Sequence, residues 1–303
     1  MTTVDLDPDD VGQLALFRRA LRGASVDLQR DLPWTRHNNP WAILVSEVML
    51  QQTSTARVIG PWTRFMAEFP TVNACAQSTL AQVLRHWSGL GYPRRAKSLH
   101  DAALAIVERF DSRVPTTIEG LLSLPGVGPY TARAVASFAY QRRVAVLDTN
   151  VGRVLARAIA NRPLRVGEAQ DLATALLPRS DVADFNQAMI DLGAQWCVRN
   201  PRCAYCPLRA QCRWIKEGGE DPAPLSAAVS RPQRPFDGSD RQVRGRVMRA
   251  LEPGPVTRRR LGRELADVDE QRLDRLVQQL AHEGLVHHRG TLVALVGDED
   301  SPR

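Results

Sequence analysis

The feature that most constrains this chain is a group of four cysteines near its middle. Cys197, Cys203, Cys206 and Cys212 are separated by five, two and five residues, and the only other cysteine is Cys75. A CxxC pair flanked by two further cysteines can place four thiolates around one metal centre, either a zinc ion or an iron-sulfur cube. The usual zinc layout has two complete CxxC pairs, so this spacing favours the iron-sulfur cluster over zinc. Disulfide bonds are the structural alternative.

The composition is that of a folded protein with a sizeable core. The 303 residues are 44% hydrophobic and 24% charged, which suits two or three domains. We expect a cytoplasmic protein without a membrane span, because residues 1–10 are acidic and no apolar run is long enough to cross a bilayer. A reducing cytoplasm disfavours disulfides. The net charge of +7 favours a polyanionic partner, although solvated basic surfaces are common.

The hydrophobic periodicity is helical throughout the main body of the chain. It runs from Val11 to about Lys216 without convincing strands, which predicts an all-α fold. A stretch rich in Pro, Ser and Gly, residues 218–239, then predicts a linker. Three helical patterns and two short strands follow, which together suggest a winged helix. These patterns lie at 241–251, 257–265, 270–283 and 285–296, the last with its turn at Arg289-Gly290.

A glycine-containing turn opens one of the predicted helices. In residues 124–132 (LPGVGPYTA), Gly126 and Gly128 permit a sharp bend, and the following helix start presents unpaired N–H groups. Such a corner can hold a phosphate. An ordinary turn between helices is the alternative, but a basic chain with a cysteine group favours phosphate. The segment looks like the hairpin of a helix-hairpin-helix element, whose amides hold the DNA backbone without reading its sequence.

Glu47 is a carboxylate within a strongly apolar segment. In residues 41–50 (WAILVSEVML) the only other polar side chain is Ser46. If this helix is buried on most sides, desolvation favours the protonated acid and makes Glu47 a candidate general acid. The alternative is an exposed polar stripe formed by Ser46, Glu47 and Gln51, and the pattern alone does not separate the two.

Asp148 follows the short apolar run 144–147 and precedes a helical pattern that begins near Val151. Aspartate is a preferred N-cap residue, and this structural role alone would explain it. Capping is compatible with catalysis, because helix-end amides keep a carboxylate ionised and its pKa low, as a nearby cationic transition state requires. Asn150 could cap the same end or reach a substrate. Glu47 and Asp148 would then be two carboxylates with divided roles, as in glycosidic bond cleavage.

Several long motifs occur in a fixed order. They are 41–53 (WAILVSEVMLQQT), 87–92 (WSGLGY), 124–132, 146–156 (VLDTNVGRVLA), 185–193 (FNQAMIDLG) and the cysteine group. With these residues the chain resembles the MutY-type adenine DNA glycosylases, members of the helix-hairpin-helix superfamily that includes endonuclease III. The resemblance covers about residues 32–213, and so many motifs in order make it specific.

The resemblance implies a division of the chain into domains. A six-helix barrel would span 33–142, with its hairpin at 124–130, and an iron-sulfur domain would span 143–216. Residues 1–32 would form a helix that joins the iron-sulfur domain. We expect a linker at 217–239, a winged-helix-like α/β domain at 240–297 and a tail at 298–303.

The resemblance also implies roles for individual residues. Glu47 would protonate the flipped-out adenine at N7 and later handle the attacking water, and Asp148 would stabilise, or transiently trap, the oxocarbenium sugar. Tyr130 and Asn150 would support this site, and the four cysteines would hold one [4Fe-4S] cluster. Gln52 would fill the gap that the extruded base leaves in the stack. Contacts with DNA are expected from Leu50, Gln51, Gln52, Tyr92, Gly126, Val127, Gly128, Arg199 and Arg202.

Tyr130 bears on the type of reaction. In endonuclease III relatives the matching position is a lysine whose amine forms a Schiff base and enables strand cleavage. No lysine lies between Lys97 and Lys216 in this chain. We therefore expect a monofunctional glycosylase that leaves an abasic site. The expected substrate is double-stranded DNA with adenine opposite 8-oxoguanine or guanine, and the enzyme is expected to act as a monomer at the bacterial nucleoid.

Two features depart from the family pattern. The first cysteine gap is five residues, while many relatives have six, and we expect the cluster to be retained. Relatives commonly carry a Nudix-like C-terminal domain, but here no Phe, Tyr or Trp follows Phe236. Between 241 and 263, eight arginines face one acid, Glu252, which predicts a phosphate-binding face or, equally, a solvated basic surface.

Two other functions remain open. Some superfamily members with tyrosine at the hairpin position remove thymine or uracil from mismatches with guanine. A DNA-binding protein with a structural cluster and no activity is the other possibility. Glu47 and Asp148 disfavour it, because phosphate binding needs neither an acid in an apolar segment nor a second carboxylate.

Overall fold

The computed structural model describes residues 8–36, 39–230 and 235–298 and separates into two compact units. The first, which we call the cysteine unit, combines the chain up to Leu32 with residues 129–232. The second, which we call the glutamate unit, combines residues 33–128 with the chain from Gln233 onward. Each unit is thus assembled from two separate stretches of sequence.

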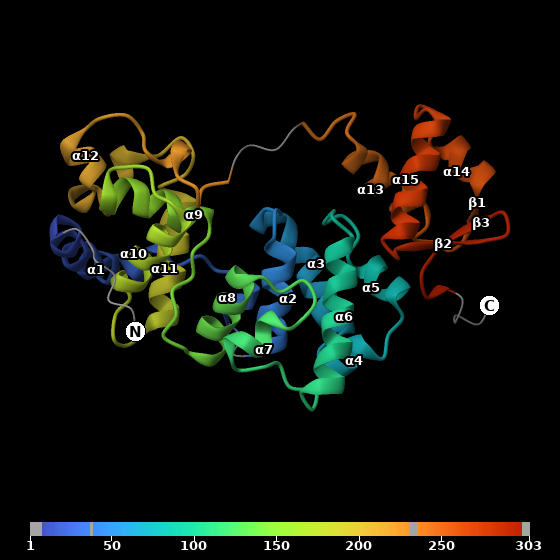
Figure 1. The fold of residues 1–303 in the computed structure, drawn as a ribbon, viewed down its shortest axis with the longest axis horizontal. Coiled ribbons are helices and arrows are strands. Elements are labelled where there is room, and N and C mark those ends of the chain that lie inside the picture. Colours follow the sequence, from blue (N-terminus) through green and yellow to red (C-terminus); the bar gives the residue numbers. More distant parts are fainter. Residues whose placement is uncertain (1–7, 37–38, 231–234, 299–303) are drawn as a thin grey trace. The chain divides into compact units, whose positions relative to one another are not determined.

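The cysteine unit is built from helices around one apolar core (Figure 1). The long N-terminal helix α1 contacts both α10 and α11 and contributes Phe17, Leu21 and Leu28 to that core. Arg18 fixes α1 by donating to the carbonyl oxygens of Leu176 and Ala175 at 2.8 and 2.7 Å. The elements of this unit are α1 (Pro8–Leu28), α8 (Pro129–Tyr140), α9 (Thr149–Val154), the π-helical η2 (Leu155–Ala160), α10 (Val166–Leu176), α11 (Val182–Gln195), η3 (Cys203–Tyr205), η4 (Arg209–Gln211), α12 (Arg213–Glu217) and η5 (Ala223–Leu225).

A glycine allows α9 and α11 to approach closely. A Cβ atom built on Gly193 of α11 would lie 2.6 Å from both the Cβ and the carbonyl oxygen of Asn150 on α9. No L-side chain fits at that distance, so the contact between the two helices depends on glycine. The motif 185–193 therefore ends in glycine for a packing reason.

The glutamate unit begins with helices whose N-termini are capped by the side chain of the preceding residue. Asn39 accepts from the Trp41 amide at 3.0 Å, and Thr79 forms a reciprocal capping box with Gln82. The indole N–H of Trp41 donates to the Phe69 carbonyl at 3.0 Å, which ties α2 to the end of α3. The elements are η1 (Pro33–Arg36), α2 (Pro40–Leu50), α3 (Thr55–Glu68), α4 (Val72–Ala76), α5 (Leu80–His86), α6 (Arg94–Arg109) and α7 (Ile118–Leu122).

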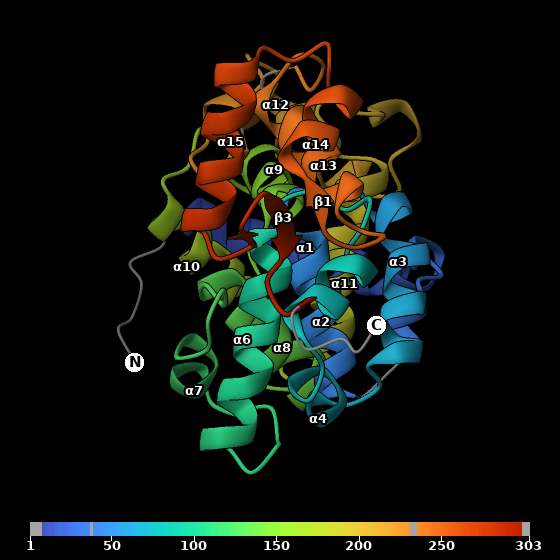
Figure 2. The same cartoon turned by 90° about the vertical axis from the view of Figure 1, so that its right-hand side faces the viewer.

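The C-terminal part of this unit contains three helices and a small antiparallel sheet. They are α13 (Asp240–Ala250), β1 (Val256–Thr257), α14 (Arg258–Glu264), α15 (Glu270–His282), β2 (Val286–Arg289) and β3 (Leu292–Leu295). Figure 2 labels the three helices together with β1 and β3, and the strand order is β1-β3-β2. In the register, Val256 pairs with Val293 and Val286 pairs with Leu295. The predicted fold class, a helical body with a small winged-helix-like α/β part, is confirmed. The sequence did not reveal β1, because two residues are too short for a periodic signal.

The C-terminal part is tied to α5 by polar contacts. Arg85 donates to the Glu252 carbonyl at 2.7 Å and forms an ion pair with the buried Asp298 at 2.6 Å. Ser88 donates to the Glu252 carboxylate. The Arg241 guanidinium donates to the Tyr92 hydroxyl at 2.9 Å. These contacts explain why residues far apart in the sequence form one unit.

Much of the positive charge predicted for this part is neutralised internally. Four of the eight arginines form ion pairs within the C-terminal part, and Arg241 donates to Tyr92. The other three, Arg249, Arg259 and Arg263, have no partner among the residues that the structure describes. The pairs are Arg244–Glu283, Arg246–Asp267, Arg258–Asp274 and Arg260–Glu264. Counting charges between 241 and 263 missed these pairs, because most of the acids lie later in the chain.

Much of the predicted linker, 217–239, does not behave as a linker in the structure but packs on the cysteine unit. Asp221 binds the buried Arg157 through two bonds of 2.8 and 2.7 Å. Ser226 is buried and accepts from the Leu164 amide at 3.1 Å. Residues up to 230 therefore pack on the cysteine unit, because they supply the partner that a buried arginine requires. Residues 231–234 lie outside the described residues.

The division between the units also differs from the expected boundary after residue 142. It follows Gly128, so the whole of α8 belongs to the cysteine unit. The reason lies in α8 itself, where the buried Ser137 accepts from Asn186 of α11 at 2.9 Å. None of the described helices is long and apolar enough to cross a membrane. The terminal tail, 298–303, is described only at residue 298.

Candidate active site and cysteine cavity

Glu47 lies on α2, where every residue from Trp41 to Met49 is buried. Its own exposure is 5%, and the neighbouring Ser46 is 1% exposed and donates to the Ile43 carbonyl at 2.8 Å. The exposed polar stripe considered from the sequence is therefore wrong, and the buried alternative is correct. A carboxylate in this setting carries a desolvation cost, and buried ionisable groups of this kind are candidates for functional sites.

The loop after α2 has an unusual backbone. Leu50 ends the helix, Gln51 is its C-cap, and the exposed Gln52 has a left-handed φ of 56°. In the WSGLGY segment, Tyr92 is also left-handed, with a φ of 48°. Such conformations cost free energy in residues other than glycine and cluster at functional sites.

Arg95 holds these two strained loops together. Its Nη1 donates to the carbonyl oxygens of Val48, Met49 and Gln51 at 2.9, 2.8 and 2.6 Å. Its Nη2 donates to Thr53 Oγ1, Leu90 O and Gly91 O at 3.0, 3.2 and 3.1 Å. The guanidinium also lies 5.3 and 5.4 Å from the ring centroids of Trp87 and Tyr92. Burial lowers the pKa of Arg95 to about 10.

The hairpin before α8 uses its two glycines differently. Gly126 has a φ of 74°, and a Cβ there would lie 2.6 Å from the Cβ of Ser98. Gly128 has no positive φ, and a Cβ on it would meet nothing within 4 Å. The sequence predicted that both glycines bend the turn, but only Gly126 does so. Val127 between them is buried and donates to the Leu124 carbonyl at 3.2 Å.

Asp148 caps the N-terminus of α9, as the sequence predicted. It accepts from the Val151 amide at 2.7 Å and from Asn150 Nδ2 at 2.6 Å. The expectation of a low pKa is wrong. Burial raises the pKa of Asp148, and this effect outweighs the lowering by Val151, Asn150 and the positive charge of Arg153.

Arg153 continues this network towards the cysteines. It donates to Asn150 Oδ1 at 2.6 Å, to the Gly193 carbonyl at 2.9 Å and to the Cys197 carbonyl at 2.7 Å. Asn150 therefore bridges Asp148 to Arg153, and Arg153 bridges Asn150 to the backbone of the first cysteine. The Val151 amide and the Asn150 side chain thus hold the two carboxylate oxygens of Asp148, and Arg153 in turn holds Asn150.

Arg157 lies in the π-helical turn η2 and is 1% exposed. It donates to the carbonyl oxygens of Cys197, Val198 and Arg199 at 3.3, 2.8 and 3.1 Å, in addition to its pairing with Asp221. The cysteine loop is therefore fixed by a guanidinium beneath it. Arg199 and Arg202, the predicted phosphate contacts, are exposed on the same loop.

The four cysteines of the sequence motif line one small cavity. They share it with apolar side chains that include Phe17, Leu192, Leu208 and Trp214. All five cysteines of the chain are free thiols, so the disulfide alternative is wrong. Burial, with a smaller contribution from neighbouring cysteines, raises the pKa of Cys206 and raises that of Cys212 to about 11.

Four thiols around one cavity are a donor set that fits an iron-sulfur cluster. Among the described residues, no three His, Cys, Asp or Glu side chains have the arrangement of ligands to a single metal ion. The ligands of the expected cluster would be Cys197, Cys203, Cys206 and Cys212.

The predicted site residues fall in both units. Glu47, Leu50, Gln51, Gln52, Tyr92 and the hairpin residues 126–128 belong to the glutamate unit, and Asp148, Asn150, Tyr130 and the cysteines belong to the cysteine unit. Tyr130 is partly buried on α8 and packs against the core of its unit. Within single units the structure brings together Asp148 with Asn150, and Gln52 with Tyr92 through Arg95.

Some residues of these sites could not be found from the sequence. Arg95, Arg153 and Arg157 are three of many arginines, and nothing in their spacing marks them as buried donors. Asn186 lies within the motif 185–193, and nothing in the sequence indicates its role. It accepts from the Val146 amide at 3.3 Å and donates to the Val144 carbonyl at 2.9 Å, which fixes the segment before Asp148.

Comparison with known proteins agrees with this geometry. Residues 45–176 match the family model described as HhH-GPD superfamily base excision DNA repair protein. An adenine DNA glycosylase of Mycolicibacterium smegmatis is 43% identical over 283 residues, covering 91% of this chain and 94% of that protein. An adenine DNA glycosylase of Mycobacterium tuberculosis is also 43% identical, over 286 residues, covering 91% of this chain and 90% of that protein.

A solved structure supports the same assignment. A thermostable thymine-DNA glycosylase matches with a TM-score of 0.62 and 25% identity, covering 68% of this chain and 98% of that chain. The matched fold, together with relatives that extend over nearly the whole chain, confirms the resemblance seen in the sequence motifs. The chain belongs to the adenine DNA glycosylase family, within the helix-hairpin-helix superfamily of base excision DNA repair proteins.

Proposed function

We propose that the protein removes adenine paired with 8-oxoguanine or guanine in double-stranded DNA. The observation that carries this proposal is the 5% exposed Glu47 on α2, followed within five residues by the left-handed Gln52 loop. A buried acid next to a strained, exposed loop suits an enzyme that takes a base out of the stack and protonates it.

In the proposed reaction, Glu47 gives its proton to N7 of the flipped-out adenine. Protonation weakens the bond between C1′ and N9, which breaks with its electron pair moving to the base. The sugar is left as an oxocarbenium ion. Glu47, now ionised, accepts a proton from water as the water oxygen bonds to C1′, and the products are adenine and an abasic site.

Asp148 is the proposed stabiliser of the oxocarbenium ion. Only its ionised form can do this, and Asn150 and the Val151 amide hold its two oxygens in place. Glu47 and Asp148 belong to different units, so their pairing around one sugar is part of the proposal.

The four cysteines would hold one [4Fe-4S] cluster. Such a cluster supplies a rigid, fully ligated scaffold and no open coordination position, so base removal remains with the carboxylates. We expect absorbance near about 400 nm and about four irons per chain in the purified native protein. Stoichiometric zinc in its place would contradict this assignment.

Tyr130 supports a monofunctional reaction, because a phenol cannot form a Schiff base with the sugar. We expect strand breaks only after heat or alkali. Strand breaks without either treatment, together with a covalent adduct trapped by borohydride, would contradict this part of the proposal.

We propose that the duplex is bound by the exposed Gln52, the half-buried Tyr92, the hairpin amides at Gly126–Gly128, and Arg199 and Arg202. Gln52 would occupy the space that the flipped base leaves. We propose a monomeric enzyme that works on the bacterial nucleoid, with one copy of the chain supplying every group named above.

Single-turnover excision tests the substrate assignment. Duplexes with A opposite 8-oxoguanine, A opposite G, and T opposite G should show cleavage of the first two only. The T:G duplex is included because one structural relative is a thymine-DNA glycosylase. The Glu47→Gln variant should lose at least about 100-fold in rate, the scale of general acid catalysis. Activity that persists in this variant would refute the role of Glu47.

A further inference from the structure

A cavity of about 490 Å³ lies within the glutamate unit, between the WSGLGY segment and α13. One wall comes from residues 87–94 and the exposed Gln52. The other comes from α13, with Arg241, Met248 and Arg249, and from Phe236. The C-terminal part therefore borders the same strained loops that lie beside the Glu47 helix.

The charge of this cavity is strongly positive. Five arginines line it, against a single acid, Glu252, which already accepts a hydrogen bond from Ser88. Arg244 is paired with Glu283, and Arg57 donates to the Gly89 carbonyl. Arg94 and Arg249 are exposed and have no partner within the described part of the chain. Two guanidinium groups thus face the cavity with their hydrogen-bonding capacity unused.

Part of the cavity lining is apolar and aromatic. Trp87 and Leu90 are 2% exposed, and Tyr92 is held by the donor Arg241 at its hydroxyl and by the Arg95 guanidinium against its ring. Exposed guanidinium groups beside the half-buried aromatic side chain of Tyr92 match the chemistry of a nucleotide, whose phosphate is an anion and whose base can stack.

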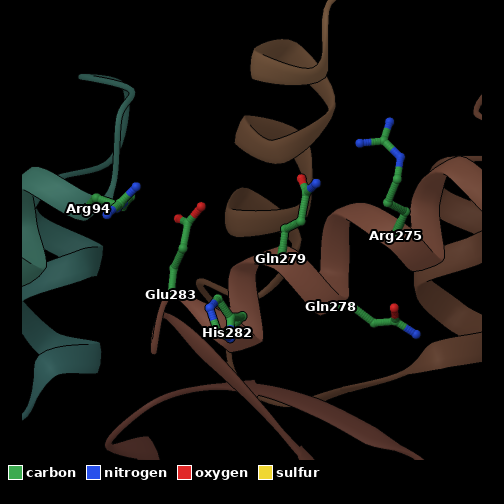
Figure 3. Close-up of a pocket in the computed structure, with 6 residues that line it drawn as sticks. All are labelled: Arg94, Arg275, Gln278, Gln279, His282 and Glu283. Atoms are coloured by element: carbon green, nitrogen blue, oxygen red, sulfur yellow. The ribbon is translucent and has the colours of Figure 1, made fainter.

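A second, wider hollow begins at the same arginine. Arg94 also lines a space of about 870 Å³ along α15. Figure 3 shows Arg94 facing Glu283 across this hollow, with Gln279 and Arg275 further along α15. Arg94 therefore borders both the cavity beside α13 and the hollow along α15.

We propose that a strand of the substrate DNA passes through the α13 cavity, where Arg94 and Arg249 bind its phosphates. This inference rests on the proposed function, because it names a further part of the surface that receives the same duplex. It assigns the C-terminal part a direct place beside the Gln52 loop, instead of a separate basic face on α14. The internal ion pairs of Arg246, Arg258 and Arg260 argue against that separate face.

The test is binding of the full-length protein to a duplex with a tetrahydrofuran abasic-site analogue opposite guanine, which no glycosylase can cleave. Kd is measured by fluorescence anisotropy over a series of salt concentrations. Arg94→Ala and Arg249→Ala should each raise Kd about five- to tenfold near 0.1 M salt. Each should also lower the slope of log Kd against log salt by about 1. Both side chains are exposed, so neither change threatens folding.

Arg259→Ala and Arg263→Ala are the matched controls. These arginines lie on α14 in the same part of the chain, are exposed, have no partner among the described residues, and do not line the cavity. Both controls should bind as the wild type does. Equal losses in all four variants would show a general charge effect, and losses confined to the α14 variants would place DNA on the other face. Either result would overturn the proposal.

A second measurement identifies the strand. Neutral methylphosphonate linkages are placed next to the lesion, in one strand at a time. A neutral linkage that removes the phosphate contact with Arg249 should weaken DNA binding by the wild type. The same linkage should not weaken DNA binding by Arg249→Ala any further. Such a result in either strand supports the proposal and names the strand, and its absence from both strands contradicts it. Adenine excision by the wild type is measured separately, so failure of the proposed function would remain distinguishable.

Discussion

Arg95 donates to five carbonyl oxygens and one hydroxyl, and these acceptors belong to the last turn of α2 and to the two loops that carry Gln52 and Tyr92. Arg95→Met would leave those acceptors without their charged donor. We expect the free energy of unfolding to fall by about 2 to 3 kcal/mol, the scale of hydrogen bonds to a charged group. Urea unfolding measures this loss. Arg94→Met, which removes the exposed neighbouring arginine, is the control and should change stability little; equal losses would contradict the role of Arg95.

Asp148 predicts a pH dependence. Burial raises its folded-state pKa above the ordinary value of 3.8, so the folded protein binds this proton more tightly than the unfolded chain. Its contribution to stability is therefore full below the ordinary value and is lost as the pH rises through the raised pKa. We expect the stability of the wild type to fall relative to Asp148→Asn over that range. Denaturant unfolding of both proteins between about pH 3 and pH 8 measures the difference.

The same titration should govern catalysis, with the opposite sign. The proposed reaction needs the Asp148 anion, so the acid limb of the single-turnover pH profile, where the rate rises with pH, should be centred on the raised pKa of Asp148. An acid limb centred near 3.8, the ordinary aspartate value, would contradict the raised pKa. At this scale the sequence could predict that Asp148 caps a helix. It could not predict the direction of the pKa shift, because burial depends on neighbours that are distant in the chain.

Alanine substitutions at two glycines of the cysteine unit distinguish the effect of close packing on stability from the effect of helix propensity. Gly193→Ala on α11 would place a methyl group 2.6 Å from Asn150, so we expect a loss of about 1 to 3 kcal/mol in stability. Because Asn150 holds Asp148, excision should slow as well. Gly23→Ala in the interior of α1 is the control: nothing lies within 4 Å, and stability should rise by about 0.5 to 1 kcal/mol. Thermal unfolding and single-turnover rates measure both, and a harmless Gly193→Ala would refute the close approach of α9 and α11.

The turn η2 carries a buried arginine whose partner lies outside the cysteine motif. Arg157→Met would leave Asp221 and the carbonyls of residues 197–199 without their donor, and we expect a loss of about 3 kcal/mol. Absorbance near 400 nm should fall in the same variant if the cysteines hold a cluster. Arg213→Met, which removes an outer i,i+4 pair with Glu217, is the matched control and should change stability by less than about 1 kcal/mol. A fully stable Arg157→Met protein would contradict this account.

At the level of elements, the helices at 240–250, 258–264 and 270–282 follow closely from the sequence, because their apolar stripes and caps are local signals. The packing of residues 219–230 on the cysteine unit was not predictable. A stretch rich in proline and glycine has the same composition whether it is exposed to solvent or packed against a core. Its ordered state depends on Arg157 and Leu164, which occur far earlier in the chain.

The C-terminal part and α5 are expected to behave as one unit. Arg85→Met removes the donor to Glu252 and the partner of the buried Asp298. We expect faster hydrogen exchange in α13 and β3, with α9 and α11 unchanged, as measured by mass spectrometry. Arg109→Met, which removes a single exposed hydrogen bond of α6, is the control. If hydrogen exchange were the same in the wild type, Arg85→Met and Arg109→Met, the polar contacts of Arg85 would not couple the C-terminal part to α5.

For the whole molecule, motifs identified the family and the fold class, because long ordered motifs are specific. The division into units was not visible, because α8 reads as one more helix of the preceding series, and its contacts with Asn186 and with the core of the cysteine unit involve residues distant in the sequence.

The discontinuity of both units has a consequence for how the chain acquires its structure. The acceptors of Arg18 on α1 lie 158 residues later in the sequence. During synthesis, the apolar face of α1 therefore emerges long before the helices that cover it, and the glutamate unit must wait for residues beyond the entire cysteine unit. Contacts between such distant parts of a chain form slowly. Newly made protein should thus pass through a period in which Phe17 and Leu21 are available to chaperones, and this period ends only when α10 and α11 have left the ribosome.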